Sequence, residues 1–500
     1  MQQFHYYLCR REAAEWMINM RTIGIFLSVV LALILLMLLI ALVRTLAVKK
    51  RVSNYTPDPD PARALKYAEM LSEMVKFETV SYPGVDRSER FSEFHTVLAK
   101  LFPLVFEKLE ITSLDGNLLI YWKGKSSERP VILMGHQDVV PADGEWTHGY
   151  FSGDIEDGKV WGRGACDTKC SVMCILQTFE ELLEVGYQPE NDLYMSSSCT
   201  EEVGGEGAPK IIAELKRRGV RPYLVCDEGG AIITDPIGGI QGNFAMIGVL
   251  EKGQGNVRFT ARSGGGHASS PGRNTPIVRL AAFENEIEKH DPFRKMFCRE
   301  AEAMFAGLAP YASFPLRYVL GNLWLFRGIL AKVMPRISAE AAAMLKTTMA
   351  FTVQSGGEAY NVIPPIASVC ANMRFIPHQD KEESVKLVSK IAAKYSLETE
   401  LIEGYGSCTP VDITGDAFKT VVKAIEEVFP GLPYTPYVMT GGTDARFFNE
   451  TCDNCIRFSP LIYGPEQMKG MHGLNENIEY SSLPGAVDFY KTLIRLNDAK

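Results

Sequence analysis

The sequence predicts an α/β protein in which helices flank a mixed, mainly parallel sheet, with a smaller α+β domain inserted into the chain and an N-terminal transmembrane helix. Three observations support this prediction. Short apolar strands alternate with amphipathic helices between about residues 117 and 230, as they do around parallel sheets. The alternation is interrupted at about residue 249 and resumes after residue 376. An uncharged apolar stretch occupies residues 23–43.

The apolar stretch, IGIFLSVVLALILLMLLIALV, predicts a single-pass membrane anchor. At about 1.5 Å per residue, such a helix spans roughly 30 Å, the thickness of a bilayer core. The alternative is a cleaved signal peptide, whose apolar core has only about 7–15 residues and ends at small residues. This stretch instead ends at Arg44. Cations lie on both sides of it, so the positive-inside rule leaves the orientation open.

The linker after the anchor contains TPDPDPAR at residues 56–63, a stiff proline-rich spacer that we expect to hold the next domain off the membrane. The predicted division of the chain is 1–22 N-terminal flank, 23–43 transmembrane anchor, 44–61 proline-rich linker, 62–248 first part of the large domain, 249–376 inserted domain and 377–500 second part of the large domain.

The elements of the large domain follow from their apolar periodicity. Residues 64–77, ALKYAEMLSEMVKF, carry apolar side chains on one helical face. The expected strands are LLIYW at 118–122, VILMG at 131–135, LYMSSSC at 193–199 and YLVC at 223–226, with helices at 171–186 and 208–220 between them.

The inserted domain shows candidate strands at residues 255–264 and 367–377 and a candidate helix at 275–290. Its middle, residues 310–334, is rich in apolar and aromatic side chains. That segment is either a membrane-contacting or substrate-gating element, or ordinary packing within a helical insertion. It lacks the roughly 18 uninterrupted apolar residues of a second membrane span.

Composition limits the class of protein. The 500 residues are enough for about two to four domains, and the net charge of −8 provides no basic surface of the kind that nucleic-acid binding requires.

The 11 cysteines are an odd number, which argues against a disulfide framework. Cys166, Cys170 and Cys174 would lie on one face of a helix. They could form a metal cluster, but we prefer to interpret them as small buried apolar residues. Cys452 and Cys455 form a C-x-x-C without a second pair, which argues against a zinc knuckle.

Acids and a histidine follow the ends of three predicted strands. The strand at 131–135 leads to His136 and Asp138, the strand at 193–199 to Glu201 and Glu202, and the strand at 223–226 to Asp227 and Glu228. Functional groups gather beyond the carboxyl ends of strands in open α/β sheets. Acids crowded there repel one another unless a cation neutralises them, and zinc accepts imidazole nitrogen and carboxylate oxygen. With Asp167 from the turn GRGACDTK, the set suffices for two metal ions; solvated surface acids and an ordinary turn are the alternative.

Five motifs resemble those of the co-catalytic zinc peptidases, a superfamily with carboxypeptidase S, aminoacylase-1 and succinyl-diaminopimelate desuccinylase. They are WTHGYFSGDIEDGKVWGRGACDTK, TEEVGG, DEGG, GGGHASSPG and KGMHG, in the family's order. The carboxypeptidase S-like branch, which has N-terminally anchored members, is the most similar. The resemblance covers roughly residues 62–495 and implies a catalytic domain with an inserted lid or dimerisation domain.

The resemblance implies a role for each matching residue in metal binding. His136 would bind one zinc ion, Asp167 would bridge both, and Glu202 and His472 would complete the second site. The remaining ligand of the first site comes from DEGG, where Asp227 and Glu228 both stay open. Asp138 would hold the His136 ring in orientation and raise its basicity.

The resemblance also implies catalytic and substrate-binding residues. Glu201 would be the general base, although an acid at a helix N-terminus is the alternative interpretation. His267 would reach across a dimer to the partner's active site and stabilise the oxyanion. Asn361, Arg374 and Thr443 match substrate-binding positions. The planar fork of an arginine suits a substrate carboxylate, although a strand arginine can also simply extend into solvent.

These features together predict a membrane-tethered dinuclear zinc hydrolase that cleaves an amide bond next to a free carboxylate. The expected substrates are small peptides, trimmed as by a carboxypeptidase; an N-acyl amino acid amidase is the alternative, and a catalytically inactive membrane-tethered binding protein is a third. A homodimer would form through the inserted domain. The resemblance favours the non-cytoplasmic side for the catalytic domain, whereas unpaired cysteines favour the other side.

Overall fold

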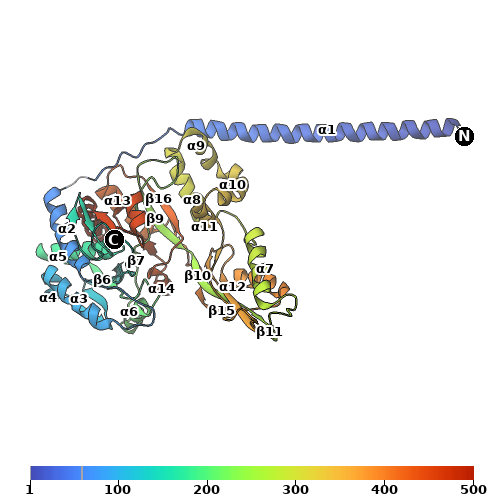
Figure 1. The fold of residues 1–500 in the computed structure, drawn as a ribbon. Coiled ribbons are helices and arrows are strands. Elements are labelled where there is room, and N and C mark those ends of the chain that lie inside the picture. Colours follow the sequence, from blue (N-terminus) through green and yellow to red (C-terminus); the bar gives the residue numbers. More distant parts are fainter. Residues whose placement is uncertain (1, 58–59, 500) are drawn as a thin grey trace.

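A ten-stranded mixed sheet forms the centre of the larger domain in the computed structural model, which describes residues 2–57 and 60–499 (Figure 1). Residues 58 and 59 of the expected linker, and most side chains of the expected N-terminal flank, lie outside the described part. The strands neighbour one another in the order β1 (Glu110–Leu114), β2 (Asn117–Trp122), β6 (Asn191–Ser197), β3 (Ser126–Met134), β7 (Leu224–Asp227), β17 (Cys455–Arg457), β9 (Asn243–Glu251), β8 (Ala231–Thr234) and β18 (Ile462–Tyr463), with β16 (Tyr434–Met439) beside β9.

The strands that carry the expected site lie parallel in the middle of this sheet. β3 pairs in parallel with β6 on one side and with β7 on the other, and β17 is parallel to β7. The pairs β1–β2, β2–β6 and β8–β9 are antiparallel. The predicted mixed α/β sheet is therefore confirmed, and the carboxyl ends of β3, β6 and β7 meet at one edge.

Helices cover both faces of the sheet. The core on one face joins α2 (Pro61–Lys76), α5 (Lys169–Glu184), α13 (Asp416–Val428) and α16 (Leu483–Asp498), and the core on the other joins α6 (Gly207–Arg217) and α14 (Ala445–Phe448). Asp60 begins α2 by accepting the backbone N–H of Arg63, with Pro61 at the first helical position. Smaller elements complete the domain: α3 (Ser88–Leu101), α4 (Pro103–Lys108), α15 (Pro465–Gly470) and a sheet of β4 (Ile155–Glu156), β5 (Lys159–Trp161) and β19 (Asn477–Glu479).

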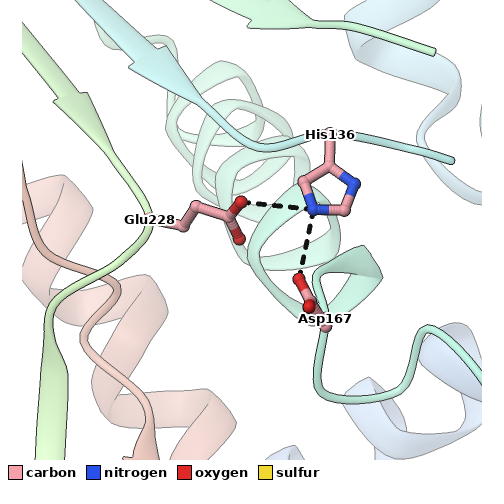
Figure 2. A group of neighbouring side chains, drawn as sticks. All are labelled: His136, Asp167 and Glu228. Atoms are coloured by element: carbon pink, nitrogen blue, oxygen red, sulfur yellow. Dashed lines mark hydrogen bonds and ion pairs between the residues drawn. The ribbon is translucent and has the colours of Figure 1, made fainter. Parts of the chain in front are cut away.

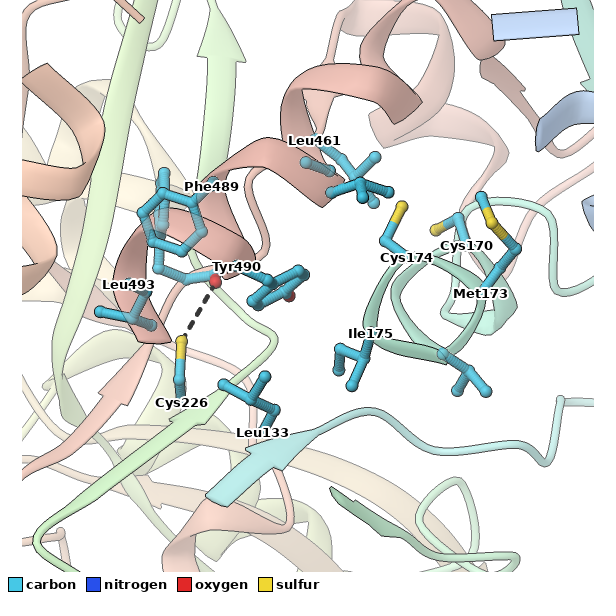
Figure 3. Packing of buried hydrophobic residues seen from close by; sticks show 14 of the residues in the cluster. Leu133, Cys170, Met173, Cys174, Ile175, Cys226, Leu461, Phe489, Tyr490 and Leu493 are labelled. Atoms are coloured by element: carbon cyan, nitrogen blue, oxygen red, sulfur yellow. Dashed lines mark hydrogen bonds between the residues drawn. The ribbon is translucent and has the colours of Figure 1, made fainter. Parts of the chain in front are cut away.

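The three cysteines at four-residue spacing are core residues. Cys166, Cys170 and Cys174 are free and buried, and they belong to the cluster between the sheet and α16. Figure 3 shows Cys170 and Cys174 on α5 near Leu461 and Tyr490. Among the described residues none of the three belongs to a group with metal-binding geometry. The preferred interpretation of these cysteines is confirmed.

The smaller domain is a four-stranded antiparallel sheet with two helices on one face. Its strand order is β12 (Thr348–Ser355), β14 (Ile366–Phe375), β10 (Gly253–Arg262) and β15 (Leu397–Tyr405), and α7 (Pro276–Lys289) and α12 (Lys381–Lys394) pack against it. The expected boundary at residue 376 is therefore wrong, because α12 and β15 follow it. Ion pairs Arg258–Glu400 and Arg262–Glu398 join β15 to β10.

A helical segment between α7 and β12 packs on the larger domain, not on the small sheet. It comprises α8 (Arg299–Leu308), the 3-10 turn Ala309–Tyr311, α9 (Phe314–Leu320), α10 (Leu323–Ile337) and α11 (Ala339–Leu345). Met304 and Phe305 share a core with Phe244 and Met246 of β9 and Val438 of β16. The expected insertion 249–376 thus contains two units: strands and α7 that belong to the small sheet, and a helical segment that packs on the larger domain.

The N-terminal helix α1 (Gln2–Ala47) leaves the body of the protein as one long rod (Figure 1). Residues 20–47 form a helix long and apolar enough to cross a membrane, and the same test is passed by signal sequences. The following linker is not a free spacer. Arg51 donates its backbone N–H to Pro310 at 2.9 Å and Ser53 donates its hydroxyl to the Asn243 carbonyl at 2.6 Å, so this part of the chain runs against the domain.

Candidate metal centre

The functional side chains predicted at the strand ends lie together. His136 and Asp138 follow β3, Glu201 and Glu202 follow β6, and Glu228 follows β7. Because these three strands are parallel neighbours, their carboxyl ends bring the side chains to one edge of the sheet. Chain segments far apart in sequence thereby form one polar site.

The first group consists of His136, Asp167 and Glu228 (Figure 2). His136 Nε2 lies 3.1 Å from Asp167 Oδ1 and 3.2 Å from Glu228 Oε1. The other ring nitrogen, Nδ1, lies 2.9 Å from the backbone carbonyl oxygen of Asp138. A carbonyl there requires a proton on Nδ1, which leaves Nε2 as the nitrogen available to a metal.

The second group consists of Asp167, Glu202 and His472. His472 Nε2 lies 3.0 Å from Asp167 Oδ2 and 3.0 Å from Glu202 Oε2. His472 follows α15 and has a φ of 54°, a left-handed conformation that is uncommon outside glycine. Asp167 belongs to both groups, with one carboxylate oxygen directed to each histidine.

The two acids left open after β7 differ in the structure. Glu228 contacts His136, whereas Asp227 accepts the backbone N–H groups of Glu228 and Ala445 at 2.9 and 2.8 Å. Asp227 belongs to neither group of potential ligands. Its carboxylate instead links the end of β7 to the beginning of α14.

The charges of the site fit divalent cations. Burial raises the pKa of Glu202 to about 7, and its Oε1 is buried without a hydrogen-bond partner among the described residues. Burial also opposes ionisation of Asp167, but hydrogen bonds from His136 and His472 lower its pKa below the usual value. Three carboxylates and two imidazoles arranged in two groups, with an unpartnered buried oxygen, match the ligands that zinc prefers.

Asp138 supports both glutamates of the second strand end. Its carboxylate accepts the backbone N–H groups of Glu201 and Glu202, each at 3.1 Å, and the hydroxyl of Ser81 at 2.7 Å. The carboxylate lies 3.5 Å from His136 Nδ1, farther than the Asp138 carbonyl oxygen. The backbone of Asp138 therefore holds the His136 ring, and its side chain fixes the loop with the two glutamates.

Glu201 lies beside both groups but belongs to neither. Its side chain is 13% exposed and faces the cavity, and burial raises its pKa well above the usual value. Arg446 Nη1 lies 3.7 Å from Glu201 Oε1 and faces the same cavity. Arg446 was not among the residues expected from the sequence, although it lies three residues after the expected substrate residue Thr443.

Glu476 is a second residue that the sequence did not indicate. It is fully buried and accepts the backbone N–H groups of Gly164, Cys166 and Asp167 at 3.1, 2.8 and 2.9 Å. Its other oxygen forms a 2.8 Å ion pair with Arg163. Glu476 thus holds the turn that presents Asp167, and its only sequence signal is its position four residues after His472.

A cavity of about 1200 Å³ opens onto the site. Its polar wall includes Asp167, Glu201, Glu202, Glu228 and His472. Another part of the wall is apolar and contains several methionines and isoleucines, contributed in part by α8 and α11. These apolar residues are Ile233, Ile237, Met246, Met304, Met344 and Met439.

Two of the expected substrate residues line this cavity and one does not. Arg374 lines it from β14 of the smaller domain. Thr443 also lines it, but its hydroxyl donates to Glu251 at 3.1 Å. Asn361 is exposed outside the cavity, as is the expected catalytic residue His267. These two lie near each other, because β11 (Gly266–His267) pairs with β13 (Val362–Ile363) and Ala268 donates its backbone N–H to Asn361.

Comparisons with known proteins agree with this fold and site. The chain is 31% identical over 478 residues to probable carboxypeptidase S-like 2 of Dictyostelium discoideum, covering 92% of both proteins. It is 32% identical over 440 residues to the N-fatty-acyl-amino acid synthase/hydrolase PM20D1 of Homo sapiens, covering 86% of this chain and 87% of that protein. The crystal structure of an M20 family metallo-carboxypeptidase, Sso-CP2 from Sulfolobus solfataricus, has the same fold, with a TM-score of 0.64 and 18% identity over 87% of this chain and 99% of the other.

The family relationship covers most of the large domain and the whole of the smaller one. The model of peptidase family M20/M25/M40 matches residues 132–496, a span that begins within β3 and ends within α16. It includes every residue of the two potential ligand groups. The expected relationship to carboxypeptidase S-like metallopeptidases is confirmed: the chain belongs to peptidase family M20/M25/M40.

Proposed function

We propose that this protein is a membrane-anchored dinuclear zinc hydrolase that cleaves an amide bond next to a free carboxylate. The observation that carries the proposal is the shared carboxylate of Asp167, whose two oxygens contact His136 and His472 in adjoining groups. A lone acidic cluster at a surface would not place two imidazoles on opposite oxygens of one partly buried aspartate.

The proposed ligands of one zinc ion are His136, Asp167 and Glu228, and those of the other are Asp167, Glu202 and His472. Bound zinc would supply Lewis acidity at the amide carbonyl. Asp227, which we expected as an alternative ligand, would instead tie β7 to α14 through its backbone acceptor bonds.

Glu201 would act as the general base. It is a largely buried carboxylate with no place in either ligand group, so it is free to take a proton from the attacking water. The same carboxyl would then deliver that proton to the leaving amine. Burial raises its pKa above that of a solvated glutamate, which suits a base that works near neutral pH.

The substrate carboxylate would be held by Arg374. Its side chain lines the same cavity as the acidic residues, and a guanidinium can donate two parallel hydrogen bonds to a carboxylate. Thr443 would shape the wall, because its hydroxyl is already engaged with Glu251. A role for His267 and Asn361 requires a second copy of the chain, because both residues are exposed outside the cavity of their own copy. A homodimer through the smaller domain would supply them.

Small peptides are the first candidate substrates, in keeping with the similarity to a probable carboxypeptidase. N-acyl amino acids are a second candidate, favoured by the apolar wall of the cavity with Met246, Met304 and Met344. The similarity to N-fatty-acyl-amino acid synthase/hydrolase PM20D1 supports the same candidate. Both substrate classes share an amide bond and a free carboxylate.

The contacts of α1 support an anchor over a cleaved signal. Ala41 and Thr45, in the last two turns of α1, are buried, and Asn322 donates hydrogen bonds to both. A signal peptide that is removed would have no reason to pack against the mature domain. On the strength of the family resemblance, we assign the hydrolase domain to the non-cytoplasmic side.

The experiment that tests the function uses the purified full-length chain, with metal analysis and a substrate panel. The panel compares dipeptides and tripeptides with a series of N-acyl amino acids of increasing acyl length. We expect two zinc ions per chain and hydrolysis of at least one class. Metal binding without hydrolysis of any substrate in the panel would favour the inactive binding protein.

A substitution in the apolar wall separates the two substrate classes. Met304→Trp fills the space near α8, while Met468→Trp changes an exposed methionine elsewhere on the cavity rim. If long acyl chains occupy the apolar wall, the first variant loses long-chain N-acyl hydrolysis and keeps hydrolysis of dipeptides. The second variant keeps both activities.

A further inference from the structure

We propose that helices α9 and α10 lie on the surface of the bilayer that holds α1, as an interfacial docking element with affinity for anionic lipid. The inference rests on the proposed function in one respect, namely that α1 spans a membrane. It adds a second membrane contact, made by a segment more than 260 positions further along the chain. Four observations support it.

The first observation is a specific contact between this segment and α1. Tyr318 of α9 donates its hydroxyl to the backbone carbonyl of Leu38 at 2.9 Å. Asn322 is fully buried and donates to the Ala41 carbonyl at 3.2 Å and to the Thr45 hydroxyl at 3.0 Å. Two of these bonds reach backbone carbonyls of α1 and the third reaches a side-chain hydroxyl of α1, so they fix the segment along the side of that helix.

The second observation is the depth of that contact. The apolar stretch of α1 ends at Val43, and Leu38 lies five residues before that end. At about 1.5 Å per residue, Tyr318 meets α1 about 7 Å inside the apolar end. Interfacial helices bury their apolar faces by roughly 5–10 Å at the boundary between headgroups and acyl chains. If α1 spans the bilayer, α9 is therefore at interfacial depth.

The third observation is an exposed apolar face on α10. Ile329, Val333 and Ile337 recur every four residues and are 64%, 39% and 77% exposed. Trp324, at the beginning of the same helix, is 45% exposed and donates its indole N–H to the Asn322 side chain. At about 100° per residue, Trp324 lies roughly 180° around the helix from Val333, so the docking face consists of Ile329, Val333 and Ile337 without the tryptophan.

The fourth observation is the charge around that face. No aspartate or glutamate occurs between Glu302 and Glu340, in a chain whose net charge is −8. The same interval carries four cations, and three more follow the end of α1. These residues are Arg317, Arg327, Lys332 and Arg336, with Lys49, Lys50 and Arg51; of them, Arg327 forms a 3.0 Å ion pair with Glu302. Cations beside an apolar face are complementary to anionic headgroups.

The chain around the docking element keeps the domain close to α1. The backbone bond from Arg51 to Pro310 and the bond from Ser53 to Asn243 tie the linker to the body near α9. A second membrane contact is therefore compatible with the path of the chain. The helical segment also contributes Met304 and Met344 to the cavity, so one unit joins the membrane contact to the candidate site.

The test places an environment-sensitive fluorophore on one introduced cysteine of the full-length chain in vesicles. Ile337→Cys reports on the docking element, and Val185→Cys is the matched control, because these side chains are 77% and 78% exposed. Val185 follows α5, which lies apart from α9 in Figure 1. The unsubstituted chain, labelled in parallel, gives the background from native thiols. Vesicles contain phosphatidylcholine with or without phosphatidylglycerol, and spin-labelled lipid is the quencher.

We expect the label at position 337 to be quenched by spin-labelled lipid and the label at 185 not to be. Quenching at 337 should be stronger with phosphatidylglycerol present and should weaken with added salt. Equal accessibility of both labels to aqueous quencher would overturn docking. Docking would also be overturned if the label at 337 were shielded from aqueous quencher in cross-linked dimers but not quenched by lipid. A second copy of the chain would then cover the apolar face of α10.

Extraction with alkaline carbonate separates failure of docking from failure of the anchor. A chain that stays with the vesicles while position 337 remains open to water retains its anchor and lacks the docking contact. A chain that is released by carbonate lacks the anchor, and the docking inference falls with it.

Discussion

Arg446 places its guanidinium 3.7 Å from the carboxylate of Glu201, and neither residue belongs to a potential ligand group. Arg446 also lies over the ring of Tyr405, 5.2 Å from its centroid, which limits how far the guanidinium can move. A fixed positive charge beside the proposed base favours its ionised form, against the burial that raises its pKa.

Replacement of Arg446 should therefore change the pH dependence of hydrolysis. In Arg446→Met the pKa of Glu201 rises, so a larger fraction of the base is protonated at low pH. The acid limb of the kcat/KM profile should move to higher pH, whereas Arg446→Lys should leave it nearly in place. If the acid limb does not move and KM rises, Arg446 instead binds the substrate carboxylate.

Glu201→Gln should remove proton transfer without removing metal. General acid–base groups contribute roughly 10²–10⁴-fold to rate, and we expect kcat to fall by that factor. Because Glu201 belongs to neither ligand group, the zinc content should remain that of the unsubstituted chain. The measurements are steady-state kinetics and metal analysis of one preparation. Unchanged kcat in this variant would exclude the proposed role of Glu201.

Glu228→Gln and Asp227→Asn should affect different properties. The first should weaken metal binding, and the second should lower the stability of the fold. The first variant loses an anionic ligand and should bind only one zinc ion tightly. The second should keep both ions and lose stability, by about 1–3 kcal/mol, because a buried acceptor of two backbone N–H groups is weakened. Zinc titration and chemical denaturation measure the two quantities. Loss of an ion in Asp227→Asn alone would reverse the assignment.

The acids at the strand ends could be predicted because an apolar strand that stops at a polar residue leaves that residue at the sheet edge. His136, Glu202 and Glu228 were found in this way. The choice between Asp227 and Glu228 could not be made from sequence, because adjacent residues leave a strand in opposite directions. The backbone N–H of Ala445, which engages Asp227, comes from a segment 218 positions later.

Other features escaped prediction for the same physical reason. Glu476 acts on the backbone of residues about 310 positions earlier, and no local pattern encodes that contact. Residues 377–500 were assigned to the larger domain as a whole, and β15 lies among them. Its sheet is decided by pairing with β10, including the ion pairs of Glu398 and Glu400. The motif containing His267 was recognised, but its distance from the cavity is a property of the tertiary structure.

Zinc binding should release protons, because metal ligation requires neutral imidazole. Hydrogen bonds to Asp167 and Glu202 raise the pKa of His472 to about 10, against about 6.5 in an unfolded chain. In the metal-free protein the ion pair between His472 and the ionised Asp167 stabilises the fold fully below about pH 6.5, and this contribution is lost as the pH rises through about 10. The pKa of His136 is also raised: burial lowers it, but the charge of Glu228 and the hydrogen bonds to neighbouring carboxylates together outweigh burial.

At pH 8 we therefore expect protons to be released when both sites fill, about one of them from His472. A pH indicator in weakly buffered solution measures the release during a zinc titration. His472→Ala should release about one proton fewer. Release that does not differ between the two proteins would show that His472 is not a ligand.

Glu476→Gln should weaken metal binding although Glu476 does not contact the proposed ions. Its buried carboxylate holds the backbone of Asp167 and pairs with Arg163, so the substitution leaves Arg163 as an uncompensated buried charge. Breaking such a pair costs about 3–5 kcal/mol, and loss of support behind a ligand typically lowers metal affinity by roughly 10–100-fold. Because Asp167 belongs to both groups, both ions should bind more weakly.

The matched control for this variant is Glu251→Gln. Glu251 forms an equally short ion pair with Arg457, also fully buried, but neither residue belongs to the ligand groups. Chemical denaturation should show that both variants are destabilised, whereas zinc titration should show weaker binding only in Glu476→Gln. Because the two lost ion pairs are alike, a general loss of stability would lower metal affinity equally in both variants. A difference between them therefore isolates the hold of Glu476 on the turn that presents Asp167.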